Sequence, residues 1–395
     1  MQAGTDFYTV TENSHKQVLN LIRIHKEISG AEIARLTGFQ PSTILYILRI
    51  LDKKGFISVS RTGDSTQKGG KKPVLWKINP GIGLMLGIEV FKTKFRFVKL
   101  DFAGNIYARG EEPLSSTFGM ENAVPLLEKF ICSILSEEEV SKKSFLGIGI
   151  GMPGLVDSFQ GLVQYSALLQ IRDLQIGERL KKRLGKPVYV VNDANAGALG
   201  ISWYHNPEFE KLPKHIVYLT YNKESKNLGA GLIISHELYE GIAGTAGEIF
   251  DPLPNLDLLI SNAVKKLGNN FPLVKEYANP ADVPFKKLAD YALDGCKLSA
   301  YTVEKICDLI SEEIARITGL LNPNLIVIGG DITCRPELLN AYILPGCSRK
   351  TSKMLKMGYV LPVVCFSSFG EFSVAMGSTA MILSKVLRIQ NHKTR

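Results

Sequence analysis

The chain has 395 residues, of which 45% are hydrophobic and 22% charged, and its formal net charge is +9. This composition excludes a disordered or fibrous protein, and the length allows about two to four domains of ordinary size. No apolar run approaches the roughly 18 residues of a membrane span, and the start lacks a secretory signal pattern, so we expect a cytoplasmic protein. The six cysteines are scattered without a C-x-x-C pair, which predicts reduced thiols and neither a disulfide framework nor a zinc site.

The positive charge is concentrated at the N-terminal end. Residues 1–80 contain twelve Lys or Arg and six Asp or Glu, so one fifth of the chain carries six of the nine excess charges. The remainder is close to neutral. Such asymmetry indicates a polyanionic partner for the N-terminal part.

The first predicted elements form a helix-turn-helix. Apolar spacing predicts a helix from Ser14 to Ile24, another over residues 30–36, a turn at Gly38 and a helix from Pro41 to Lys53. The last helix would bury Ile44, Ile47, Leu48 and Leu51 and present polar residues at its N-terminal end, where recognition helices meet bases and phosphates. The predicted DNA-reading residues are Gln40, Ser42, Thr43, Tyr46 and Arg49.

A strand starting at Phe56 follows, then a Gly-, Ser- and Lys-rich loop and a second strand, which is the pattern of a wing. Basic loops of this kind track phosphates or enter a minor groove, so we add Arg61, Lys68, Lys71 and Lys72 to the predicted DNA contacts. The alternative is a plain helical hairpin with a solvated loop. The wing and the local charge together favour double-stranded DNA as partner.

From about residue 84 short strands alternate with helices. The predicted segments are strands at 84–91, 95–102, 105–114 and 145–157, a helix at 121–139, a strand running into a helix at 187–204, strands at 215–221 and 229–241, a helical region at 303–321, strands at 324–332 and 362–370, and a final helix from 371 or 372 to about 387. This order predicts two α/β lobes whose loops face one cleft.

Six segments of this body, in order and at family spacing, are similar to the landmarks of the ROK family. They are GIEVFKTKF (87–95), GIGMPGLVD (149–157), VNDANAGALG (191–200), NLGAGLII (227–234), GTAGEI (244–249) and LIVIGGD (325–331). The resemblance implies a two-lobed, actin-like ATPase body of the ROK sugar kinase type. With the winged helix-turn-helix in front, it is nearest to the NagC/XylR/Mlc type of sugar-responsive repressor. The implied domains are 1–80, then lobe 1 at 81–200 with the final helix at about 371–390, and lobe 2 at 201–370.

The sequence departs from the kinase pattern at both phosphate loops. Where a family kinase has an Asp-x-Gly-Gly-Thr turn, this chain has Glu89 followed by Val90, Phe91, Lys92 and Thr93, and Ser225-Lys226-Asn227 replaces the second loop's Gly-Thr-Gly. Side chains at these positions oppose the close approach of ATP phosphates. The family's zinc segment is also missing, since residues 248–261 contain no His or Cys. We therefore predict no kinase activity, no ATP and no metal.

The resemblance assigns a set of polar residues to the sugar side of the cleft. Asn192 and Asp193 match the pair whose Asp is the kinase base, Glu248 matches the Gly-Glu motif, Asp251 stands in place of a His, and Asp257 lies near a downstream Glu. With Gly154 they are the predicted effector site, because carboxylates and amides accept from vicinal hydroxyls. The alternatives are a helix N-cap for Asp193 and a solvated loop charge for Glu248.

These features predict a DNA-binding transcriptional regulator, most simply a repressor, controlled by a carbohydrate effector. The missing zinc segment and Asp251 suggest an effector other than glucose or N-acetylglucosamine, such as a pentose, an oligosaccharide or an amino sugar. A homodimer, or a dimer of dimers, on an inverted repeat is the expected assembly. Two other hypotheses stay open: a sugar kinase with a fused DNA-binding domain, and a DNA-binding scaffold without a ligand.

Overall fold

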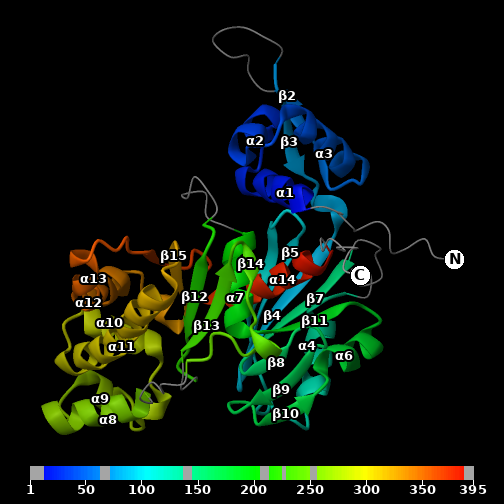
Figure 1. Ribbon diagram of the computed structural model, residues 1–395. Coiled ribbons are helices and arrows are strands. Elements are labelled where there is room, and N and C mark those ends of the chain that lie inside the picture. Colours follow the sequence, from blue (N-terminus) through cyan, green and yellow to red (C-terminus); the bar gives the residue numbers. More distant parts are fainter. Residues whose placement is uncertain are drawn as a thin grey trace.

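The computed structural model describes residues 13–62, 72–136, 145–204, 213–224, 228–249 and 256–386. Figure 1 shows a small N-terminal module standing at one end of a larger body. The class is mixed α/β, as the sequence predicts. Within the described ranges no helix has both the length and the apolar character needed to cross a bilayer.

The N-terminal module is a winged helix-turn-helix. Its elements are α1 (Asn13–His25), β1 (Ile28–Ser29), α2 (Gly30–Thr37), α3 (Pro41–Lys53), β2 (Ile57–Thr62) and β3 (Val74–Ile78). The strands form a sheet in the order β1-β3-β2. Ser29 caps α2 by accepting from the backbone N–H of Glu32, and Gly38 ends the helix at φ 74°, a conformation that glycine adopts without strain.

The first lobe contains a five-stranded sheet in the order β11-β7-β4-β5-β6. Its elements are β4 (Leu84–Val90), β5 (Lys94–Asp101), β6 (Ile106–Pro113), α4 (Ala123–Ile134), β7 (Phe145–Met152), α6 (Ile176–Leu184) and β11 (Val188–Asn192). A second, antiparallel sheet of β8 (Leu155–Asp157), β9 (Leu162–Ser166) and β10 (Ile171–Leu174) covers one end. The sequence analysis missed this small sheet, because its strands have three to five residues and little apolar alternation.

The second lobe repeats the strand arrangement of the first. Its sheet has the order β14-β13-β12-β15-β16, with an antiparallel hairpin on one side and parallel strands on the other. The strands are β12 (Ile216–Tyr221), β13 (Gly229–Ile234), β14 (Glu237–Leu238), β15 (Leu325–Gly330) and β16 (Val363–Phe366). Its helices are α8 (Leu256–Leu267), α9 (Pro272–Glu276), α10 (Phe285–Leu293), α11 (Lys297–Leu321), α12 (Leu344–Lys350) and α13 (Ser352–Lys356).

Two helices, α7 (Asp193–Trp203) and α14 (Ser373–Val386), lie side by side between the sheets. α14 packs on β4 and β7 of the first lobe, whereas α7 packs on β12 and β13 of the second. The two helices approach closely because both carry glycine at the crossing: a Cβ added at Gly377 would lie 1.7 Å from the carbonyl oxygen of Ala196. The lobes are therefore joined through a tightly interlocked helix pair.

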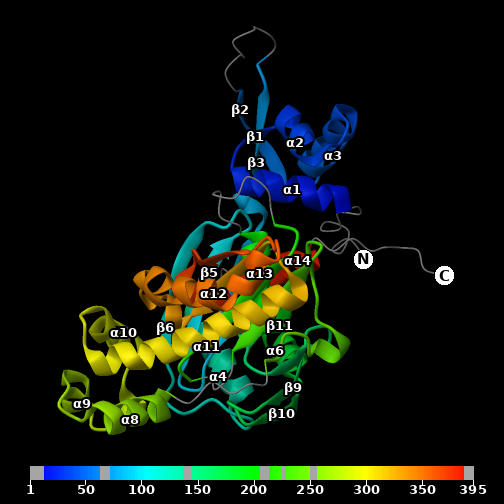
Figure 2. The same ribbon diagram turned by 60° about the vertical axis from the view of Figure 1, so that its left-hand side comes forward.

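The N-terminal module packs directly on the body. One continuous hydrophobic core runs from Ile22 of α1 and Phe56 to Phe102 at the end of β5 and onward to α7 and α14. The rings of Phe56 and Phe102 lie 5.7 Å apart between centroids. Both ribbon views place α1 at the junction (Figures 1 and 2). The position of the module is thus set by buried contacts as well as by the chain connection.

Candidate functional site

The exposed face of α3 carries the predicted DNA-reading residues. Ile44, Ile47, Leu48 and Leu51 are buried, as the helical spacing predicts, and they anchor α3 in the module. Gln40, Ser42, Thr43, Tyr46 and Arg49 are all exposed. Tyr46 is 60% exposed although it is aromatic, and its ring makes an edge-on contact with His15 of α1 at 6.5 Å between centroids. The N-terminal half of α3 therefore presents a free polar surface.

The wing residues divide into two groups. Arg61 is exposed but forms an ion pair with Glu27 at 2.9 Å, and Ser60 donates to the same carboxylate. The positive charge of Arg61 is therefore partly compensated within the module. Lys72 is exposed. Lys68 and Lys71 lie outside the described residues.

Asn192 and Gly154 form the rigid part of the predicted effector site. The side-chain oxygen of Asn192 accepts from the backbone N–H of Asn195 at 3.0 Å, and its amide nitrogen donates to the Gly154 carbonyl at 2.9 Å. Gly154 has φ 111°, and a Cβ there would lie 2.3 Å from the Tyr165 carbonyl oxygen, so only glycine fits. Asn192 is thus the N-cap of α7, the role that sequence reasoning offered as the alternative for Asp193.

Asp193 is the first residue of α7 and lies beside Glu248. Glu248 forms an isolated bridge with Gly229, where an added Cβ would lie 4.0 Å from Oδ1 of Asp193. Burial raises the pKa of Asp193 to about 7, and the neighbouring Glu248 adds to the shift. Burial also raises the pKa of Glu248. Two carboxyl groups thus share one poorly solvated region between the lobes, with capacity to accept hydrogen bonds from hydroxyl groups.

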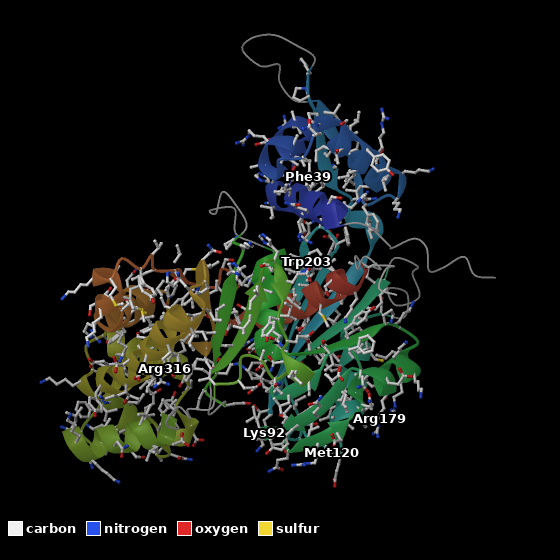
Figure 3. The ribbon with its side chains drawn as sticks, in the orientation of Figure 1. Phe39, Lys92, Met120, Arg179, Trp203 and Arg316 are labelled. Atoms are coloured by element: carbon white, nitrogen blue, oxygen red, sulfur yellow. The ribbon has the colours of Figure 1, made fainter. Side chains whose placement is uncertain are left out.

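The turn between β4 and β5 is occupied by a residue that sequence reasoning missed. The carboxylate of Glu224, which follows β12 in the second lobe, accepts from the backbone N–H of Lys92 at 3.1 Å and from the Thr93 hydroxyl at 2.8 Å. The sequence predicts that Phe91 and Lys92 block this turn. In the structure Phe91 is buried and the N–H of Lys92 is still presented, but to a carboxylate of the chain itself. Figure 3 shows Lys92 at the end of the body far from the N-terminal module.

The same end of β4 contains a buried ionic network. Arg96 is fully buried and pairs with Glu89 at 3.2 Å and with Glu111 at 2.5 Å, and it also donates to the carbonyl of Glu371 at 2.6 Å. Burial raises the pKa of Glu89 to about 8 in spite of Arg96. The ring of Phe91 packs against the Arg96 guanidinium at 4.9 Å. An internal cation and its partners therefore fill the region behind the turn.

Of the remaining predicted residues, Asp257 alone belongs to the described part of the structure. Asp251 and the Ser225-Lys226-Asn227 stretch lie outside the described residues. Asp257 is in the first turn of α8, directly after the undescribed segment 250–255. No three His, Cys, Asp or Glu side chains within the described ranges gather as metal ligands. Because residues 248–261 also contain no His or Cys, the donor set does not fit the family's zinc.

Comparisons with known proteins found a matching family profile and related sequences. The profile of the ROK family matches residues 85–250. A xylose repressor homologue of Caldicellulosiruptor sp. (strain Rt8B.4) is 30% identical over 351 residues, covering 81% of this chain and 84% of the relative. The xylose repressor of Caldicellulosiruptor bescii is 25% identical over 394 residues, with 94% of this chain and 95% of that protein covered.

Among solved structures, the chain resembles a ROK family transcriptional regulator described as a homologue of the E. coli Mlc protein. The TM-score is 0.68 at 18% identity, covering 94% of this chain and 98% of that chain. At this identity the likeness shows the fold, including an N-terminal segment in front of the two lobes.

Proposed function

The chain belongs to the ROK family, and we propose that it is a DNA-binding transcriptional repressor whose effector is D-xylose. The two xylose repressors that match over most of their length support this assignment. Of the three effector classes that the sequence suggests, the pentose fits their names. The exposed polar surface of α3, on a module that carries two thirds of the net charge, supports DNA as the macromolecular partner.

The observation that carries the proposal is the carboxylate of Glu224 in the β4–β5 turn. In family kinases this turn approaches ATP phosphates. A carboxylate that already accepts from Lys92 and Thr93 competes with a phosphate for the same donors and repels its charge. The protein therefore acts as a ligand-controlled regulator that has no phosphoryl transfer, although the base-like Asp193 is retained.

The sugar lies, in this proposal, against Asp193 and Glu248. Their carboxyl oxygens accept from vicinal hydroxyls, while Asn192 and Gly154 fix the start of α7 and the loop that faces it. Asp251 and Asp257 are secondary candidates for the same role. No zinc and no ATP are required.

On DNA, the protein binds as a homodimer to an inverted repeat. Ser42, Thr43 and Arg49 lie nearest the bases, and Lys68, Lys71 and Lys72 follow the phosphates. A two-fold dimer places two α3 helices in successive major grooves of one DNA face.

The test starts from a duplex that the full-length protein selects out of random DNA. Its affinity is measured with and without D-xylose, with D-glucose and N-acetylglucosamine as comparison sugars, and calorimetry measures sugar binding directly. We expect only D-xylose to bind and to weaken operator binding. In Asp193→Ala and Glu248→Ala, sugar affinity should fall about 10- to 100-fold, since each buried bond to a charged group contributes about 1.5–3 kcal/mol.

The matched control is Glu237→Gln, which changes an exposed carboxylate in the same lobe as Glu248 and should leave sugar affinity unchanged. Absence of sequence-selective DNA binding would contradict the repressor. If another sugar bound more tightly than D-xylose, the identity of the effector would be wrong, but the repressor assignment would stand. Sugar phosphorylation that depends on Asp193, in a coupled assay with ATP, would favour the kinase instead.

A further inference from the structure

The junction between the N-terminal module and the body contains a buried arginine held by aromatic rings. The guanidinium carbon of Arg23, on α1, lies 4.6 Å from the centroid of Trp203 and 5.5 Å from that of Tyr204. Arg23 is only 9% exposed, and Trp203 only 3%. Figure 3 shows Trp203 directly beneath the module. This is the contact that the end of α7 makes with the DNA-binding unit.

The cationic side chain is incompletely satisfied in this place. Its Nη2 donates to Asn20 of the same helix, but its Nε has no hydrogen-bond partner among the described residues. Burial lowers the pKa of Arg23 to about 10. A buried cation whose main compensation is two aromatic faces depends steeply on where those faces lie. A small displacement of Trp203 therefore changes the energy of this contact.

The other end of α7 is the predicted effector site. The helix starts at Asp193, next to Glu248, and ends ten residues later at Trp203, about 15 Å away along its axis. Every residue from Ala194 to Trp203 is buried. A Cβ at Gly231 would lie 2.2 Å from the carbonyl oxygen of Ala194, and one at Gly197 would lie 2.1 Å from the ring of Tyr218. Contacts this close couple α7 rigidly to β12 and β13, so a displacement at Asp193 moves the whole helix, Trp203 included.

Tyr204 connects the end of α7 to the second central helix. Its hydroxyl is 2.7 Å from the Thr379 hydroxyl of α14, and its ring packs edge-on against Phe369 at 6.3 Å. The aromatic pair at the junction is thus fixed to both central helices. A change in how the lobes close on α7 and α14 reaches Arg23 through these two rings.

From this arrangement we propose that α7 transmits effector binding to the DNA-binding module, with Arg23 as the positioning residue that receives the signal. The inference rests on the proposed function, because it takes the sugar to lie against Asp193. When the sugar binds, α7 shifts relative to α1, and the contact of the Arg23 guanidinium with the rings of Trp203 and Tyr204 changes. The module then rotates away from the orientation that fits the operator. The coupling is a differential affinity between two orientations of the module.

The experiment measures the ratio of operator dissociation constants with and without D-xylose in the full-length protein. The variants are Arg23→Met, which keeps the length of the side chain and removes its charge, and Trp203→Leu, which removes the ring. We expect a ratio of roughly tenfold or more in the wild type, within the usual range of allosteric coupling, and a ratio below about twofold in both variants. Xylose affinity by calorimetry should stay within about twofold of the wild type, since Asp193 is untouched.

The matched control is Arg35→Met, which removes one charge from the exposed surface of α2 in the same module. It should leave the ratio intact even if operator affinity itself falls. A full xylose response in Arg23→Met and Trp203→Leu would overturn the inference. Circular dichroism identifies a variant that does not fold, and Trp203→Phe, which keeps a weaker aromatic face, should then give an intermediate ratio.

Failure of the proposed effector is distinguishable from failure of the inference. If calorimetry finds no binding of D-xylose to the wild type, the effector assignment is wrong, and the coupling is tested without sugar. Asp193→Asn then perturbs one end of α7, and its effect on operator affinity is measured with Arg23 and with Arg23→Met. Sites this far apart are normally additive, so a non-additive cycle supports transmission along α7, and additive effects overturn it.

Discussion

Glu224 accepts a hydrogen bond of 2.8 Å from the hydroxyl of Thr93, and so connects the second lobe to the first. The two residues are separated by 131 positions in the chain. The same carboxylate also accepts from the backbone N–H of Lys92, so one side chain holds the β4–β5 turn at two points.

Removal of this contact should weaken the association of the lobes. In Thr93→Val we expect the free energy of unfolding to fall by about 1 kcal/mol, because one charge-assisted bond at a partly exposed site is lost. Glu224→Ala should lose more, because it also removes the acceptor of the Lys92 backbone N–H. The double variant should lose less than the sum, since both single changes remove the same bond. Urea denaturation of the wild type, the two single variants and the double variant measures this double-mutant cycle. Strictly additive losses would mean that the bond contributes nothing in solution.

Stability should also depend on pH through Asp193. Its pKa of about 7 is far above the ordinary value of about 3.9, so the folded protein holds this proton more tightly than the unfolded chain. The resulting stabilisation is full below about pH 4, falls as the pH rises through about 7 and is constant above that. Asp193→Asn should therefore stabilise the protein relative to the wild type more at pH 8 than at pH 4. Equal effects at both pH values in denaturation experiments would contradict the buried carboxyl.

The wing should act on every DNA sequence alike. Replacing Lys68, Lys71 and Lys72 with Ala removes up to three phosphate contacts, and the slope of log affinity against log salt should fall by about 0.9 for each. Lys181→Ala with Lys182→Ala, on the exposed surface of α6, is the control for net charge. Fluorescence anisotropy across a salt series measures the DNA affinity and its salt slope for the triple variant and for the control. An unchanged slope in the triple variant would remove the wing from the DNA interface.

Substitution of Asn192 should lower the stability of the folded protein, whatever its effect on sugar binding. Asn192→Ala loses the N-cap of α7 and leaves the Gly154 carbonyl without its donor, so we expect a loss of about 1–3 kcal/mol in the free energy of unfolding. Asn192→Asp retains the cap but cannot donate to Gly154, and should lose less. If the alanine variant were as stable as the wild type, the structural role of the Asn192 amide would be contradicted, and its function would be ligand binding.

Much of the fold could be predicted from the sequence because its signals are local. Gly38 and Pro41 mark helix ends by their own chemistry, and the buried strands of both lobes are continuous apolar runs. The ROK family membership followed from motifs in order. Glu224 could not be found in this way, because its role depends on a tertiary contact with a turn 131 positions away.

The junction at Arg23 was missed for a similar reason. An arginine in an amphipathic helix is normally solvated, and only the packed module shows that this one faces Trp203. The assignment of the N-cap to Asn192 and not to Asp193 was decided by one residue of register. Sequence patterns leave helix ends uncertain by about that much.

The close packing of α7 against α14 also limits how this protein can change over generations. A side chain larger than hydrogen at Gly377 of α14, or at Gly231 of β13 facing α7, would collide with backbone atoms, so substitutions at these glycines destabilise the folded protein. Under the proposed function, adaptation to a new sugar is therefore expected from substitutions at residues 241–249, which include Gly247 and Glu248. Such a chain could exchange its inducer by loop substitutions and keep the response of its DNA-binding module unaltered.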